Sequence, residues 1–246
     1  MGKHNLAWIF NNQLERLLNV RIERKERTFD WRRAFLVEQI SPDLTLDGGA
    51  NRGQWASALR SRFSDIEIWS FEPLLKPFNL LTSKCIADPH WSAFNVALGD
   101  MPGVLNANLA SNQEMSSSLL TSGMHSVIHP KISFDSKEEV NVITLDSLLP
   151  QIGPRRIFLK LDLQGYEAAA LEGALDLLKQ VDIVEIESSF TPLYEGETAH
   201  HPLVSKLMKR GFTPFATSAP HQDRFGREFA LDTLLVSDLA LKGIYS

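Results

Sequence analysis

Cysteine is nearly missing from this chain of 246 residues, in which Cys85 stands alone. An internal disulfide is therefore excluded, and a chain of this length can bury a stable core without one. Because thiols stay reduced in the cytosol, we expect a cytoplasmic protein. No apolar run approaches the roughly 20 residues that span a bilayer, so we expect no stable membrane insertion.

Positive charge is also scarce, with 25 Lys and Arg against 30 Asp and Glu and a formal net charge of −5. A chain with this balance has no general attraction to nucleic-acid phosphates, so we expect no nucleic-acid partner. Its composition is that of an ordinary globular domain. The oligomeric state stays open, a homo-oligomer included.

Strand and helix patterns alternate along most of the chain. The expected strands are 44–47, 67–71, 92–98, 157–162, 183–187, 212–216 and 231–236, and the expected helices are 31–40, 54–62, 76–84, 166–179 and 203–210. This alternation predicts an α/β fold, with a mostly parallel sheet covered on both faces. A polar hairpin between the last two strands predicts an antiparallel edge.

The chain is expected to form one domain at residues 41–246, preceded by an N-terminal helical extension at 1–40. Apolar residues recur at helical spacing in 6–18 and again in 31–40. Residues 101–141 interrupt the alternation and are rich in Ser, Asn and Gly. A long segment without periodicity inside an α/β domain is usually functional, so we predict a substrate-facing insertion there.

Glycines and acids gather at the end of the first expected strand, in the sequence Leu-Asp-Gly-Gly-Ala-Asn-Arg-Gly at 46–53. A Walker A loop would need Lys and then Ser or Thr after Gly53, where Gln54 and Trp55 stand instead. A dinucleotide fingerprint is closer, but Ala50 replaces its middle glycine and Asp47 would face the phosphates.

A cofactor with a positive charge beside its ribose would suit Asp47 better. S-adenosylmethionine has a sulfonium, an ammonium group and no phosphate, so the turn favours this cofactor. The residues predicted to bind it are Asp47, Gly48, Gly49, Asn51 and Gly53. The alternative is a glycine-rich turn with a structural role alone.

Two more strand ends would complete the cofactor pocket. Glu72 follows the second strand, and a carboxylate can accept hydrogen bonds from both ribose hydroxyls. Its alternative role is to cap the next helix. Asn95 and Ala97, at the end of the third strand, would lie near the adenine ring. The alternative there is a simple turn.

Acids at the ends of two later strands are the predicted catalytic residues. Asp162 would border both the cofactor and an acceptor hydroxyl, whose proton it could remove, although it could instead cap a helix. Glu187 could join it in binding acceptor hydroxyls. A metal ion needs more oxygen ligands than this pair supplies, so we predict no metal site. Loop histidines at 125, 129, 200, 201 and 221 could also supply a base.

The ordered set of motifs resembles the FkbM family of S-adenosylmethionine-dependent methyltransferases. The matching segments are 46–53, 71–73, 95–100, 117–119, 142–148 and 159–167. The resemblance implies a Rossmann-like class I methyltransferase fold with a seven-stranded sheet, in which the 47–53 turn, Glu72 and Asp162 border the cofactor and reaction centre. It also implies O-methylation of sugars, polyketides or related hydroxylated metabolites. Gln164 stands where the family usually has Glu, and an amide can hydrogen-bond there.

We therefore predict an S-adenosylmethionine-dependent methyltransferase, with residues 41–246 as its catalytic domain. Its partner would be a small-molecule or saccharide acceptor, methylated on a hydroxyl by in-line displacement. Segments 101–141 and 190–202 would shape the acceptor pocket. The alternatives are an NAD-dependent oxidoreductase, for which the degenerate fingerprint Gly48-x-Ala50-x-x-Gly53 is the best evidence, and a non-catalytic module that keeps the cofactor pocket.

Overall fold

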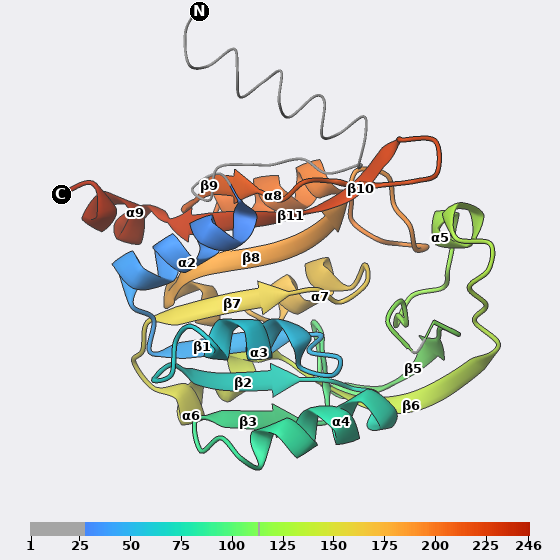
Figure 1. Cartoon of the computed structure of the whole chain (residues 1–246), viewed down its shortest axis with the longest axis horizontal. Coiled ribbons are helices and arrows are strands. Elements are labelled where there is room, and N and C mark those ends of the chain that lie inside the picture. The colour runs from blue at the N-terminus through green and yellow to red at the C-terminus, as the bar shows by residue number, and fades with distance from the viewer. Residues whose placement is uncertain (1–27, 113) are drawn as a thin grey trace, which may run out of the picture.

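A central sheet of eight strands organises the protein, in the order β10-β11-β8-β7-β1-β2-β3 with β9 also beside β11 (Figure 1). The computed structural model describes residues 28–112 and 114–246. The helix expected at 6–18 lies outside them. The parallel strands are β1 (Leu44–Gly48), β2 (Glu67–Phe71), β3 (Trp91–Phe94), β7 (Ile157–Leu161) and β8 (Val181–Ser189).

The antiparallel part of the sheet is built on β11 (Glu228–Ser237), which pairs with β8. On its other side, β9 (Phe212–Thr217) pairs with one end of β11 and the two-residue β10 (His221–Gln222) with the other. β9 and β10 thus share one edge position, which leaves seven strand positions across the sheet. The predicted α/β fold, mostly parallel with an antiparallel edge, is confirmed.

Helices cover both faces of the sheet, and two apolar cores lie between them and the strands. One face carries α2 (Phe29–Ile40), α3 (Gln54–Arg60), α4 (Leu75–Cys85) and α9 (Asp238–Ile244); the other carries α6 (Leu149–Ile152), α7 (Glu167–Glu172) and α8 (His200–Met208). Strand residues point alternately to the two faces, so Leu44 and Leu46 pack in the core beneath α7. In residues 28–112 and 114–246, no helix is both long and apolar enough to cross a bilayer.

A buried ion pair holds helix α2 against strand β8 of the sheet. Arg33 donates to both carboxylate oxygens of Glu185 on β8, at 2.5 and 2.7 Å. The indole N–H of Trp55 on α3 donates to the same carboxylate at 3.0 Å. Glu185 is 3% exposed, so its charge depends on these partners.

The prediction of one strand at 92–98 is wrong, because the chain leaves the central sheet within this segment and enters a second sheet. β3 ends at Phe94, and β4 (Ala97–Leu98) instead pairs with β6 (Ser136–Ile143) in a second sheet of three strands. β5 (Gly103–Leu109) is the third member, antiparallel to β6. β5 and α5 (Met124–Ile128) both belong to residues 101–141, the segment that the sequence predicts as an insertion. This segment lies beyond the carboxyl ends of the parallel strands (Figure 1).

The prediction of a single helix at 166–179 is also wrong. α7 ends at Glu172, and a short 3-10 helix, η3 (Leu177–Lys179), follows. Gly173 lies between them, where a Cβ atom would come within 2.0 Å of the carbonyl oxygen of Gly99. This close approach of two loops stops the helix, although the apolar spacing continues through it.

Candidate active site

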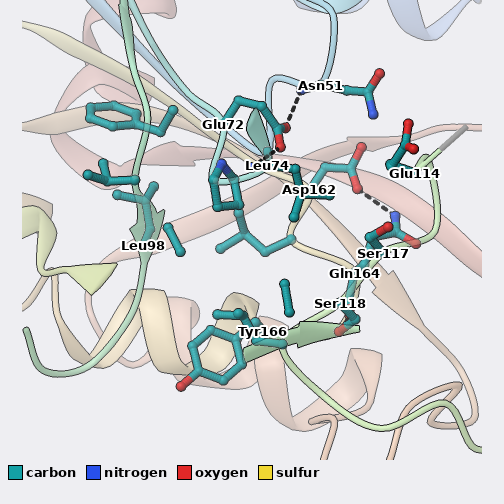
Figure 2. Close-up of a pocket in the computed structure, with 18 of the residues that line it drawn as sticks. Asn51, Glu72, Leu74, Leu98, Glu114, Ser117, Ser118, Asp162, Gln164 and Tyr166 are labelled. Carbon is teal, nitrogen blue, oxygen red and sulfur yellow. Dashed lines mark hydrogen bonds between the residues drawn. The ribbon is translucent and has the colours of Figure 1, made fainter. Parts of the chain in front are cut away.

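A cavity of about 80 Å³, partly open to solvent, lies where the parallel strands end (Figure 2). Its lining comes from the turn after β1, the segment after β2, the second sheet, residues 114–119 and the segment after β7. The residues include Gly49, Asn51, Phe71, Glu72, Leu74, Val96, Ala97, Leu98, Ser117, Ser118, Asp162, Gln164 and Tyr166.

Glu72 has a fixed carboxylate in this cavity. One oxygen accepts from the backbone N–H of Asn51 at 2.8 Å, and the other accepts from that of Leu74 at 2.9 Å (Figure 2). Burial raises the pKa of Glu72 to about 7, although the two amides favour its charged form. Each oxygen keeps lone-pair capacity for a further donor.

The turn after β1 brings backbone close to the cavity. Gly49 and Asn51 have φ angles of 71° and 48°, and the N–H groups of Gly49 and Ala50 both donate to the Phe71 carbonyl at 3.0 Å. A Cβ atom on Gly49 would lie 1.8 Å from the Asp162 carbonyl oxygen, so glycine is required there. Asn51 adopts the left-handed conformation, which asparagine tolerates better than most other residues.

Asp47 lies beneath the turn and does not line the cavity. It is fully buried, accepts from the Ser70 hydroxyl at 2.9 Å and pairs with the Lys160 ammonium at 3.3 Å. Lys160 also donates to the carbonyls of Gly48 and Gly49 at 3.1 and 3.2 Å. Burial opposes the charge of Lys160, but Asp47 and Asp162 together hold its pKa above the ordinary value. This ion pair fixes the backbone of the turn.

Of the other predicted cofactor residues, Ala97 lines the cavity, whereas Gly48, Gly53 and Asn95 support it from behind. Gly53 is left-handed and begins α3, where a Cβ atom would collide with neighbouring side chains. A Cβ atom on Gly48 would also be crowded. The Asn95 side chain donates to the carbonyls of Glu72 and Pro73 at 3.0 and 2.8 Å, so it holds the segment after β2.

A second cavity, of about 450 Å³ and open to solvent, adjoins the first. It is bordered by the segments that the sequence predicts to shape an acceptor pocket, so we call it the acceptor chamber. Met115, Asp162 and Gln164 line both cavities. Its other walls come from α5, the end of β8, the loop at 193–197 and the β10–β11 hairpin. These walls include His125, His129, Glu187, Ser188, Tyr194, Glu197, His221 and Phe229.

Gln164 connects the two predicted catalytic acids. Its amide nitrogen donates to Asp162 at 2.9 Å and to Glu187 at 3.0 Å, so both N–H bonds are used. Its amide oxygen lies 3.0 Å from the hydroxyl of Tyr194. The structure thus brings Asp162 and Glu187 together through a residue to which the sequence assigns no role beyond hydrogen bonding. The available signal is its position two residues after Asp162 in the 159–167 motif.

Asp162 and Glu187 differ in how readily they release a proton. Burial and the neighbouring Asp162 carboxylate raise the pKa of Glu187 well above its ordinary value. Burial opposes ionisation of Asp162 as well, but Lys160 and hydrogen bonds from Glu187 and Gln164 hold its pKa below the ordinary value. Asp162 is therefore ionised at neutral pH, and Glu187 holds a proton more readily than Asp162 does. The Asp162 side chain is 38% exposed, so a ligand can reach it.

The histidines do not form a metal site in the part of the chain that the structure describes, where no group of three or more His, Cys, Asp or Glu is arranged to hold an ion. His125 is 4% exposed and packs against Tyr194 and His129, with ring centroids 5.4 and 4.9 Å apart. Burial lowers the pKa of His125 to about 4, so its ring is neutral. Another imidazole, that of His200, bonds to the Ser188 hydroxyl at 2.8 Å.

Comparisons with known proteins give one family. The sequence profile of the methyltransferase FkbM domain matches residues 47–214. No curated protein sequence matches the chain. Among solved structures, the plantazolicin methyltransferase BamL is 9% identical over 96% of this chain and 91% of its own, with a TM-score of 0.47. The N-methyltransferase NodS from Bradyrhizobium japonicum is 11% identical over 92% and 97%, with a TM-score of 0.45.

Proposed function

Because the chain belongs to the FkbM methyltransferase family, we propose that it methylates a hydroxyl group on a sugar, glycan or related metabolite. Its cofactor is S-adenosylmethionine, which supplies the methyl group on a sulfonium. The observation that carries the proposal is the meeting of two cavities at Asp162 and Gln164. One cavity has the features of a nucleoside site, and the other has room for an acceptor.

The lining of the first cavity fits the cofactor. Glu72 presents a fixed carboxylate for ribose hydroxyls, and Phe71, Val96 and Leu98 offer apolar surface for adenine. The lining has no Lys or Arg among the described residues, so a pyrophosphate would meet acids without a cation. NAD is therefore the less favoured ligand.

We assign direct cofactor contact to Gly49, Asn51, Glu72, Ala97 and Asp162, all of which line the cavity. The remaining predicted residues would act indirectly. In this proposal Asp47, Gly48 and Gly53 keep the turn in shape, and Asn95 keeps Glu72 in place.

Asp162 is our proposed base. It is ionised, partly exposed and shared by both cavities, so it can orient an acceptor hydroxyl and receive its proton. The raised pKa of Glu187 favours a proton on that carboxyl group, which could then donate a hydrogen bond to the acceptor. A positioned base contributes roughly 10²- to 10⁴-fold to rate, and alignment of the two reactants supplies the rest.

The proposal also includes a cytoplasmic location and a methyltransferase domain at 41–246, with residues 101–141 as an insertion that forms part of the acceptor chamber. The single cysteine supports the location.

Calorimetry and a transfer assay together test the proposed function. S-adenosylhomocysteine should bind and NAD should not, and labelled methyl should pass to members of a saccharide panel. Asp162→Asn should keep S-adenosylhomocysteine binding and lose transfer. Binding of NAD without binding of S-adenosylhomocysteine would refute the cofactor assignment. Binding without transfer to any acceptor in the panel or in cell extract would favour a non-catalytic module.

A further inference from the structure

Acidic side chains line the acceptor chamber, and Asp162 is the one that its neighbours keep ionised. The chamber lining includes Asp162, Glu167, Glu187 and Glu197, and it includes no Lys or Arg among the described residues. An acceptor with its own negative charge would therefore enter a site that offers no fixed cation. This charge balance bears on the class of acceptor, and its meaning for catalysis rests on the proposed function.

Two of these acids accept hydrogen bonds from backbone N–H groups. Glu167 accepts from the N–H groups of Leu163 and Gly165, at 2.6 and 3.3 Å. Glu197 accepts from those of Leu193 and Tyr194, at 2.6 and 3.0 Å. Both side chains are buried, and their contacts shape the loops around the chamber.

The other two acids remain accessible. The side chains of Asp162 and Glu187 are 38% and 23% exposed, and Gln164 holds them together. Asp162 is the more acidic of the two, and their carboxyl oxygens lie at one place. This combination suits hydroxyl groups, which both donate and accept hydrogen bonds.

The histidines of the chamber do not balance the acids. His125 is buried and neutral, and the Nε2 atom of His221 lies 3.9 Å from a Glu187 oxygen, so a proton on that imidazole would already face an acid. Their rings instead add flat apolar surface. His129 and His221 lie against Phe229, with centroids 5.8 and 6.0 Å apart. Such faces suit a ring stacked on them, with hydroxyls at its edge.

We propose that the acceptor chamber binds a neutral, hydroxyl-bearing ring and discriminates by charge against carboxylated, phosphorylated or sulfated acceptors. Asp162 and Glu187 recognise the hydroxyls, and Phe229 with its neighbouring imidazoles contacts the ring face. An anionic group about 5 Å from the Asp162 carboxylate would be repelled, at an effective dielectric constant near 20, by an amount that corresponds to at most roughly a hundredfold in affinity. The buried Lys160 ammonium, 3.8 Å from that carboxylate, offsets part of this repulsion.

Saturation-transfer NMR on the full chain with excess S-adenosylhomocysteine tests this, with matched probes. The pairs are methyl glucoside with methyl glucuronide, and N-acetylglucosamine with its 6-phosphate. Each neutral member should bind at least about tenfold more tightly. Equal or tighter binding of the anionic members would overturn the proposal, and so would failure of every member to bind. Calorimetry with S-adenosylhomocysteine alone reports separately on the cofactor site. A failure of the proposed methyltransferase function can therefore be told apart from a failure of the proposed charge discrimination.

A charge substitution sharpens the test. Gln222 is exposed on β10 and lines the chamber, so Gln222→Lys places a cation there at little risk to the fold. Binding of the anionic probes should then rise about tenfold. Thr217→Lys, exposed on β9 and outside the lining, is the matched control and should change nothing. Phe229→Ala should weaken the neutral probes and leave S-adenosylhomocysteine affinity intact. An unchanged probe preference in Gln222→Lys would contradict charge as the determinant.

Discussion

The pKa of Glu72 should make cofactor affinity depend on pH within the physiological range. The carboxylate is 5% exposed and both its oxygens accept from backbone N–H groups, yet burial still raises its pKa to about 7. Ribose hydroxyls would donate to the ionised form. Binding should therefore strengthen as pH rises through 7.

The size of the effect follows from the ionised fraction. With a pKa of about 7, about one molecule in eleven has Glu72 ionised at pH 6, and about ten in eleven at pH 8. The dissociation constant should thus fall about tenfold between these values, since the competent fraction scales the apparent affinity. Fold stability should respond in the opposite sense. Because the folded pKa lies above the ordinary value of 4.5, this group's contribution is full below pH 4.5 and is lost as pH rises through about 7.

Calorimetric titration with S-adenosylhomocysteine at pH 6, 7 and 8 measures the dependence. Glu72→Gln should abolish it and weaken binding at pH 8 by about ten- to a hundredfold, since a hydrogen bond to a charged group contributes roughly 1.5–3 kcal/mol. Glu67→Gln on the same strand is the control, because Glu67 pairs with Arg155 and does not line the cavity. Equal affinity at all three pH values in the unaltered protein would refute the reasoning.

Three further substitutions test the site. Asp162→Asn keeps a hydrogen-bonding group at the cofactor, so it should still bind S-adenosylhomocysteine, but it should lower the transfer rate by roughly 10²- to 10⁴-fold in steady-state assays; near-normal turnover would exclude Asp162 as the base. Gly49→Ala should lower the thermal midpoint sharply, because its new methyl would meet the Asp162 carbonyl, and an unchanged midpoint would contradict the close approach. Lys160→Met leaves Asp47 charged and buried without its partner, so denaturant titration should show a loss of about 3–5 kcal/mol.

Local patterns in the sequence are sufficient for most of the fold. Strands β1, β2 and β7 lie within a residue of the predicted limits, because each is mostly apolar and is followed directly by a glycine or an acidic residue. The two wrong elements depend on contacts between distant segments. Nothing local at 92–98 shows that Ala97 will pair with Val142 on β6, and nothing local at Gly173 shows how close Gly99 will come.

The site is predictable where strand ends supply it. Glu72, Asn51 and Asp162 reach the cavity because parallel strands end at one edge of the sheet. Asp47 shows the limit of this reasoning. Its charge suggests a partner for the cofactor, but the register that places Lys160 beside it on β7 is a property of the assembled sheet. The bridge that Gln164 makes to Glu187 likewise needs β7 and β8 side by side.

The attachment of α2 has a practical consequence for anyone who shortens this enzyme. A version that starts after Ile40 would delete Arg33 and leave the Glu185 carboxylate in the interior with a single indole N–H as partner. Isolating such a charge typically costs about 3–5 kcal/mol, a large part of the stability of an ordinary domain. Crystallisation trials should therefore retain α2, or pair its removal with an apolar substitution at Glu185.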